Sequence, residues 1–259
     1  MNLVFVAETF CQLKKFKYHK RMSNISWLGS QDAFPNPIHD SDPDPSVPGL
    51  IAVSERIYPG QLARAYQMGI FPWYSDNQPV LWWSPNPRMV LKVDELKVRK
   101  SLSKVLRNTP YRVTCDQAFA QVIAACRQVP RAGQAGTWLQ PEVVQAYCAL
   151  HEAGYAHSFE TWENGVLVGG FYGVAIGLMF YGESMFHLSD DASKKAFFHG
   201  VSHLQRHGFQ WIDCQMHTDY LASFGAKLIP RADLIAHLNH AITQKPSEGI
   251  WQFEYLNLV

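Results

Sequence analysis

The sequence predicts an α+β protein in which a small N-terminal α/β domain precedes a larger domain. A run of helices is followed by a β-hairpin, a helix, a buried strand and further helix. Of the 259 residues, 47% are hydrophobic, so the chain can bury a sizeable core. The pattern changes near Pro87, which gives a poorly ordered N-terminal extension over 1–30, a small domain over 31–87 and the main domain over 88–259.

The small domain is predicted to hold a loop, one helix and short strands or turns. Prolines and aspartates between residues 31 and 49 favour an extended loop. Pro59 and Gly69 stand near the start and the end of a predicted helix. The aromatic segments 70–75 and 81–88 then indicate short strands or turns.

The main domain is predicted to open with helices and to continue with strands. Asp116 is expected to cap a helix, and Glu163, Asn164 and Gly165 are expected to form a hairpin turn. The expected helices are a basic one over 97–108 and others over 116–127, 141–152, 191–207, 218–225 and 232–242. The expected strands are 157–162, 166–172, 178–186 and 211–215.

The formal net charge of +1 conceals an uneven distribution. Residues 88–112 hold eight Lys or Arg residues against Asp94 and Glu95, a net +6. Residues 1–22 hold five against Glu8, a net +4, so the rest of the chain sums to −9. The near-neutral total excludes a protein that is basic all over. The 88–112 segment is either a solvated helix face or a footprint for a phosphate backbone.

Cysteine usage and hydropathy favour a cytoplasmic protein without a membrane anchor. The five cysteines form no CxxC pair, which argues against a disulfide scaffold and a zinc knuckle. No apolar run approaches the roughly 18 residues of a membrane span. In residues 1–22 the lysines follow the apolar stretch, which is the reverse of a signal peptide.

The segment Trp211–Gln215 carries polar side chains on an apolar strand. Alternation would place Asp213 and Gln215 on one face and Cys214 on the other. The polar pair is either a buried hydrogen-bonded network or a carboxylate and an amide directed at a substrate. Cys214 as a nucleophile is the weaker interpretation, because a buried cysteine usually behaves as a small hydrophobic residue.

Three further groups have a structural and a functional interpretation. Glu183 at a strand end is either a surface carboxylate or the receiver of a cationic ligand. The glycines between 169 and 173 lack phosphate-loop patterns, so they indicate close backbone contact or a bulge. His199, His203 and His207 recur at four-residue steps, but no HExxH or cysteine pair accompanies them, and we expect no metal.

Several tryptophans lie outside the strand-rich region, namely Trp73, Trp82, Trp83 and Trp138. Core packing is the default for tryptophan, yet an exposed ring can also stack on an unpaired base. A basic helix accompanied by exposed tryptophans suits the single-stranded acceptor end of a tRNA.

A series of motifs runs in order from about Phe34 to Arg231. The motifs are Ala65–Ser75, Leu81–Arg88, Gly136–Trp138, Gly154–Ser158, Leu167–Val174, Gly182–Phe186, Ala192–Lys194, Ile212–Gln215, Ala222–Ala226 and Ile229–Arg231. Together they resemble the leucyl/phenylalanyl-tRNA–protein transferase family. Each motif alone is weak, but their common order along the chain is highly specific.

The resemblance implies a bacterial cytoplasmic aminoacyltransferase of the N-degron pathway. Its main domain would be GNAT-like, with a mixed sheet. Such enzymes move Leu or Phe, in some cases Met, from aminoacyl-tRNA to the N-terminal Arg or Lys of a protein and so mark it for degradation. The chemistry requires no metal or organic cofactor, and we expect a monomer.

The resemblance also assigns roles to particular residues. Asp213 and Gln215 match a catalytic pair, and our hypothesis is that Asp213 draws the proton from the attacking amine. The aminoacyl pocket would hold Phe171, Phe180, Glu183 and Met185, the terminal adenosine would contact Trp73 and Trp138, and the tRNA backbone would contact Arg99, Lys100, Lys104 and Arg107.

Two alternatives remain open at this point. An acetyltransferase using acetyl-CoA would need closely spaced Gly and Arg residues between a strand and a helix, whereas residues 187–193 hold two aspartates and no glycine. A non-catalytic tRNA-binding module would not need Asp213 and Gln215 on one face.

Overall fold

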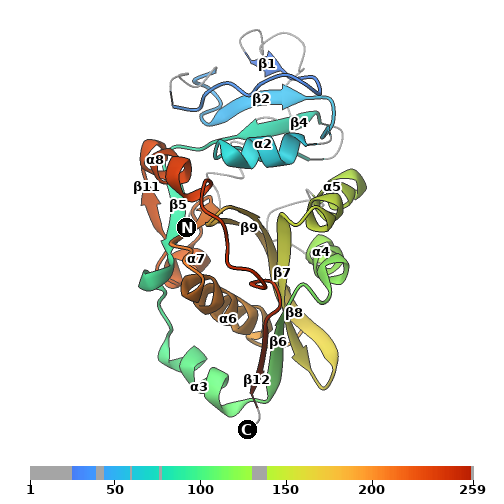
Figure 1. Ribbon diagram of the computed structural model, residues 1–259, viewed down its shortest axis with the longest axis vertical. Coiled ribbons are helices and arrows are strands. Elements are labelled where there is room, and N and C mark those ends of the chain that lie inside the picture. The colour runs from blue at the N-terminus through green and yellow to red at the C-terminus, as the bar shows by residue number, and fades with distance from the viewer. Residues whose placement is uncertain (1–24, 39–43, 59, 76–77, 130–138, 258–259) are drawn as a thin grey trace.

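The computed structural model describes residues 25–38, 44–58, 60–75, 78–129 and 139–257. These residues form a four-stranded sheet and an eight-stranded sheet with helices around them (Figure 1). The α+β class with a mixed main sheet is confirmed. Among the described residues, no helix has the length and apolar character needed to span a membrane.

The four-stranded sheet belongs to the N-terminal part of the chain, with the strand order β1-β2-β4-β3. Residues 25–30 of the expected extension join it through β1, whereas residues 1–24 lie outside the described residues. Helix α2 packs against the main domain as well as against this sheet, since Tyr181 of the main domain donates a hydrogen bond to the Tyr66 carbonyl oxygen at 2.7 Å. The elements are β1 (Ser26–Trp27), β2 (Leu50–Ser54), α2 (Gln61–Gln67), β3 (Phe71–Pro72) and β4 (Val80–Trp83).

The eight-stranded sheet has the order β11-β5-β10-β9-β8-β7-β6-β12. Strands β9 and β10 run parallel, and every other neighbouring pair is antiparallel. The strands are β5 (Arg88–Lys92), β6 (Tyr111–Cys115), β7 (Ala156–Glu163), β8 (Val166–Ile176), β9 (Met179–His187), β10 (Trp211–Gln215), β11 (Lys227–Ile229) and β12 (Glu254–Asn257).

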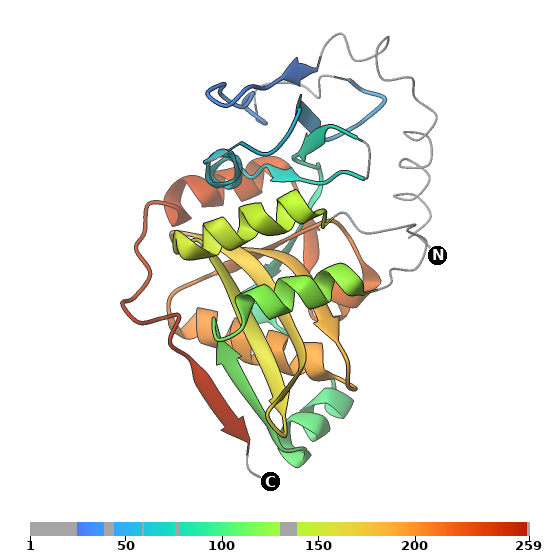
Figure 2. The ribbon, with the colours of Figure 1, turned by 90° about the vertical axis from the view of Figure 1, so that its right-hand side faces the viewer.

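Helices cover both faces of this sheet (Figures 1 and 2). Alternation along β8 and β9 sends Tyr172 and Tyr181 into one core and Phe171 and Phe180 into the other. Helices α4 (Phe119–Gln128) and α5 (Pro141–Glu152) cover the tyrosine face, and α6 (Ala192–Arg206) covers the phenylalanine face. The remaining helices are η1 (Val93–Glu95), α3 (Lys100–Asn108), α7 (Asp219–Ser223) and α8 (Arg231–Ala241).

The predicted hairpin is confirmed, with Asn164 and Gly165 at positive φ values of 51° and 77° between β7 and β8. The glycine-rich segment of β8 contains the expected bulge, between Tyr172 and Gly173. A Cβ on Gly173 would lie 2.3 Å from the Tyr181 carbonyl oxygen, so this glycine permits close backbone contact.

Two local predictions are wrong. Asp116 does not cap a helix: its φ is 56°, its side chain bonds residues of β7, and α4 begins at Phe119. The basic helix begins at Lys100, so Lys97 lies outside it. Strands β1, β2, β5, β6, β11 and β12 were not predicted. Each of them is short, and its place in a sheet is set by partners distant in the sequence.

Gly200 in α6 provides a test of this packing. Alanine favours a helix more than glycine does, but a Cβ here would lie 2.7 Å from Cζ of Phe171. We therefore expect Gly200→Ala to lower the free energy of unfolding by about 1–3 kcal/mol, the usual cost of overpacking. Urea unfolding followed by circular dichroism measures this change.

Gln205→Ala is the matched control, since Gln205 is an exposed residue of the same helix. It should leave the midpoint of unfolding nearly unchanged. A Gly200→Ala protein as stable as the original would contradict the close packing of α6 on Phe171.

Candidate active site

A cavity of about 500 Å³ opens where the small domain meets β8, β9, β10 and α7. Its wall is mostly apolar, and the small domain contributes Pro72 and Trp73. The apolar side chains of the main domain that line it include Phe171, Met185, Phe197, Ile212, Met216 and Leu221. The cavity can therefore take an apolar group next to a small number of fixed polar groups.

Glu183 places a carboxylate in this cavity, held by three side-chain donors from three elements. Tyr66 of α2 donates to Oε1 at 2.6 Å, and Tyr147 of α5 donates to Oε2 at 3.0 Å. Gln215 Nε2 donates to Oε1 at 2.8 Å. The two tyrosine hydroxyl oxygens lie 2.5 Å apart. The small domain and the main domain thus share one hydrogen-bond network around Glu183.

Burial decides the protonation of Glu183. Desolvation raises the pKa of its carboxyl to about 7, although the bonds from Tyr66 and Tyr147 lower it. Burial and the neighbouring carboxylate also hold the pKa of both tyrosines well above the ordinary value. Near neutral pH, Glu183 is therefore the member of this network that can gain or lose a proton.

Asp213 lies behind the cavity rather than on its wall. Arg88 of β5 binds it in a bidentate manner, with Nε 2.8 Å from Oδ1 and a terminal nitrogen 2.6 Å from Oδ2. The two side chains are 1% and 0% exposed. Removing one partner of such a pair strongly destabilises the folded protein, because the other charge is then buried without a partner.

Gln215 reaches the cavity because β10 departs from simple alternation. A register shift lies between Asp213 and Gln215, and Gln215 adopts φ of 61°. Its backbone N–H donates to Asp213 Oδ1 at 2.8 Å. Both Cys214 and Gln215 line the cavity, so the expectation that Asp213 and Gln215 share a face opposite Cys214 is wrong.

The structure brings most of the proposed pocket residues together. Phe171, Glu183 and Met185 line the cavity with Gln215 and Trp73. Phe180 does not line it and instead packs edge-on behind Phe171, with ring centroids 6.1 Å apart. Trp138 lies outside the described residues.

The basic helix α3 lies at the end of the main domain farthest from the four-stranded sheet (Figure 1). Leu102 and Leu106 anchor it in the core. Four basic side chains of this region are exposed: Arg99, Lys100, Lys104 and Arg107. Arg88 belongs to the same basic stretch of sequence but is buried against Asp213, so it adds nothing to the exposed charge.

The weaker sequence candidates have structural roles. Burial raises the pKa of the Cys214 thiol to about 12, so it stays protonated and is a poor nucleophile at neutral pH. His199 bonds the Tyr111 hydroxyl, and His203 bonds the Ile250 carbonyl oxygen at 2.7 Å. Burial lowers the pKa of His199 to about 4, which keeps that ring neutral.

Sequence reasoning missed Arg88, Tyr66 and Tyr147. An arginine at the start of the apolar segment Arg88–Lys92 was the one available signal for a buried charge. The tyrosines carry no comparable signal, because their partners lie 117 and 36 residues away in sequence.

The charge of the cavity wall has one sign. Among the described residues that line it, the acidic ones are Glu183 and Asp219, and there is neither Lys nor Arg. Asp219 is exposed at the start of α7. The wall therefore favours a cationic or amine-bearing group over an anion.

Comparison with known proteins agrees with this arrangement. Residues 90–239 match the family model described as leucyl/phenylalanyl-tRNA protein transferase, and residues 56–86 match the model of its N-terminal domain. The C-terminal domain of a putative lysylphosphatidylglycerol synthetase from Agrobacterium fabrum is similar at a TM-score of 0.38, with 14% identity over 78% of this chain and 75% of that chain. That likeness is too weak to support an argument.

Two relatives carry the same family name. The leucyl/phenylalanyl-tRNA–protein transferase of Chromobacterium violaceum is 52% identical over 231 residues, which cover 89% of this chain and 97% of that one. The protein of the same name from Burkholderia multivorans is 48% identical over 234 residues, covering 89% and 91%. The chain belongs to the leucyl/phenylalanyl-tRNA–protein transferase family.

Proposed function

We propose that this protein transfers leucine or phenylalanine from aminoacyl-tRNA to the N-terminal amine of a protein that begins with Arg or Lys. The observation that carries the proposal is one cavity with an apolar wall on one side and the Glu183–Gln215 pair on the other. Since aminoacyl-tRNA is made in the cytoplasm, we place the reaction there. We further propose that the protein acts as a monomer and that the transferred residue marks its products for degradation.

The apolar wall selects the aminoacyl side chain. Phe171, Met185 and Ile212 offer no hydrogen-bonding side-chain groups beyond the weak thioether, so a polar side chain would lose its hydration there without compensation. A difference of one methylene changes binding by only about 1–3 kcal/mol. Leucine and phenylalanine should thus both be accepted, with methionine as a possible third substrate.

Trp73 is positioned for the terminal adenosine of the tRNA. It lies on the cavity wall directly after β3, and its backbone carbonyl accepts a hydrogen bond from Trp83 at 2.7 Å. This bond fixes the backbone that presents the ring. A fixed aromatic face at the mouth of a cavity suits base stacking.

The acidic groups of the cavity suit the acceptor. An N-terminal Arg or Lys brings an α-amine and a second positive charge on its side chain. Glu183 and Gln215 lie together inside the cavity, while Asp219 lies exposed on its lining. We assign the α-amine to the first pair and the cationic side chain to Asp219.

Glu183 is the better candidate for receiving the proton of the attacking amine. During transfer the amine nitrogen forms a bond to the ester carbonyl carbon, the bond to the ribose oxygen breaks, and one amine proton ends on that oxygen. A carboxyl group with a pKa near 7 can take up this proton and release it again near neutral pH. Glu183 has such a pKa and lines the cavity. Asp213 lies behind the cavity, fully buried and paired with the Arg88 charge, so we assign it a positioning role.

An assay with two acyl donors tests the proposed function. The protein is incubated with a peptide that begins with Arg, together with either radiolabelled leucyl-tRNA or labelled acetyl-CoA. We expect label to reach the peptide only from the tRNA, and a peptide that begins with Ala to stay unlabelled. Transfer of the acetyl group would instead support an acetyltransferase. That outcome is disfavoured by Asp190 and Asp191 at the start of α6, since both would repel a pyrophosphate.

Glu183→Gln tests the proton acceptor. We expect kcat for transfer to fall by about 10²–10⁴-fold, the usual contribution of general acid–base catalysis. In the original protein the carboxyl is protonated below its pKa of about 7, so the rate should rise as the pH increases through that value. The variant should lose the rise near pH 7 and keep only the rise set by the acceptor α-amine, whose pKa is about 7.7–8.0, as measured by single-turnover transfer between pH 5.5 and 8.5.

Asp213→Asn is the matched comparison for a positioning residue. It should lower kcat and stability, because the Arg88 charge is left buried without its partner. The limb near pH 7 should nevertheless remain, since Glu183 is intact. If this variant lost the limb and Glu183→Gln kept it, Asp213 would be the base.

Exposed basic residues of α3 are proposed to bind the tRNA backbone, and salt dependence tests this. Each lost phosphate contact lowers the slope of log affinity against log salt by about 0.7–0.9. A variant with Lys100→Gln, Lys104→Gln and Arg107→Gln should therefore lose about 2–3 units of slope in filter binding of leucyl-tRNA.

Lys245→Gln is the control, because Lys245 is an exposed lysine beyond α8. Its slope should match that of the original protein. An unchanged slope in the triple variant would show that the basic residues of α3 face solvent and do not contact the tRNA backbone.

A further inference from the structure

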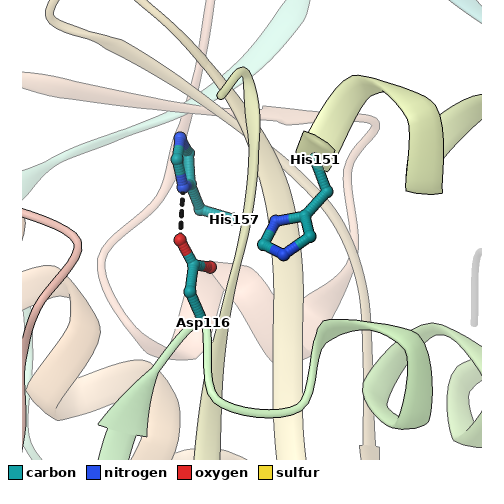
Figure 3. A group of neighbouring side chains, drawn as sticks. All are labelled: Asp116, His151 and His157. Atoms are coloured by element: carbon teal, nitrogen blue, oxygen red, sulfur yellow. Dashed lines mark hydrogen bonds and ion pairs between the residues drawn. The ribbon is translucent and has the colours of Figure 1, made fainter. Parts of the chain in front are cut away.

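Outside the cavity, Asp116, His151 and His157 lie close together, and the Asp116 carboxylate faces the His157 ring (Figure 3). Asp116 follows β6, His151 is in the last turn of α5, and His157 is on β7. Each side chain offers one ligand atom, and these atoms lie within 4.8 Å of one another. Three elements distant in sequence thus bring two imidazoles and a carboxylate to one point.

Each of the three side chains is held by the backbone through one of its polar atoms. His151 Nδ1 lies 2.7 Å from the Ala156 carbonyl oxygen, and His157 Nε2 lies 3.2 Å from the Gly154 carbonyl oxygen. The Ser158 backbone N–H donates to Asp116 Oδ1 at 2.8 Å. Orientation of metal ligands by backbone groups through the opposite ring nitrogen or carboxylate oxygen is the usual outer shell of a metal site.

These bonds fix the protons on the imidazole rings. A carbonyl oxygen only accepts, so Nδ1 of His151 and Nε2 of His157 carry hydrogen. A neutral imidazole holds one N–H, which leaves a lone pair on Nδ1 of His157. That atom lies 2.7 Å from Asp116 Oδ2, which is also an acceptor. Nδ1 of His157 and Oδ2 of Asp116 are thus close enough to bind one cation together.

The surroundings allow an ion to enter from one side. His157 is 3% exposed and stacks on Trp251 with ring centroids 3.4 Å apart, whereas Asp116 is 17% exposed. Asp116 and Trp251 also line a hollow of about 420 Å³. The Trp251 ring covers one face of His157, and the hollow leaves room for water beside Asp116.

We propose that Asp116, His151 and His157 bind one divalent transition-metal ion of the zinc class, with water from the hollow as a further ligand. Imidazole nitrogen with carboxylate oxygen is a donor set that zinc accepts, at bond lengths of about 2.0–2.2 Å.

The proposed ion would act on the fold rather than on the transfer reaction. None of its ligands lines the main cavity. It would tie the end of α5 and the connection from β6 to α4 onto β7, beside the segment that contains Trp251. An ion that binds the folded chain alone should raise the melting temperature.

Equilibrium dialysis of the full chain, freed of metal by a chelator, against zinc chloride tests the proposal. We expect one zinc ion per chain, and at least a tenfold loss of affinity in Asp116→Asn and in His151→Gln. Asparagine tolerates the φ of 56° at this position, and His151 is only partly buried, so both variants should fold. His240→Gln, at an exposed histidine of α8, is the control and should bind zinc normally.

Two further measurements sharpen the test. Cobalt chloride should give visible absorption bands of a low-coordinate site in the original protein and in His240→Gln only. Zinc should raise the melting temperature of these two proteins and not of the other variants. Absence of binding at 100 micromolar zinc, or equal binding by all variants, would overturn the proposal and leave the group as an Asp116–His157 ion pair.

Discussion

The buried pair of Arg88 and Asp213 is the interaction on which the rest of the site depends. Arg88 is the first residue of the main sheet, and its guanidinium also lies over the Phe71 ring of the small domain, 4.7 Å from the centroid. Asp213 in turn accepts the backbone N–H of Gln215 and so fixes the bulge that turns this side chain into the cavity. One charge pair therefore sets both the junction of the two domains and the place of a polar side chain on the cavity wall. Such a pair specifies geometry more than it adds stability.

The same junction determines the chemistry of Glu183. Tyr66 comes from the small domain and Tyr147 from α5, so the carboxyl is desolvated only when both pack onto β9. Desolvation is the largest cause of its raised pKa, and the tyrosine bonds act against it. The ability to exchange a proton near neutrality is thus a consequence of how the domains pack.

Much of the fold could be predicted from local pattern, and much of the site could not. The hairpin at Asn164 and Gly165 and the helices after residue 140 are encoded by neighbouring residues, so their prediction succeeded. Asp116 shows the limit: it has the chemistry of a helix cap, but partners on β7 engage it instead. Gln215 shows the same limit. The sequence predicts alternating side chains along β10, but a register shift between Asp213 and Gln215 interrupts the alternation. Pairings across more than a hundred residues, such as Arg88 with Asp213, leave no local pattern at all.

The cavity combines a permissive wall with a strictly defined polar side, and this contrast has a physical cause. Apolar contacts are non-directional, so the wall of Phe171, Met185 and Ile212 discriminates among side chains by volume alone. The strength of a hydrogen bond falls steeply when its distance or angle departs from the preferred value. Glu183 and Gln215 are therefore held in place by partners from several elements. Under the proposed function, precision is concentrated where the amine would meet the ester, and tolerance is left where the side chain of the transferred residue would lie. Such a site would accept several apolar residues while performing a single reaction.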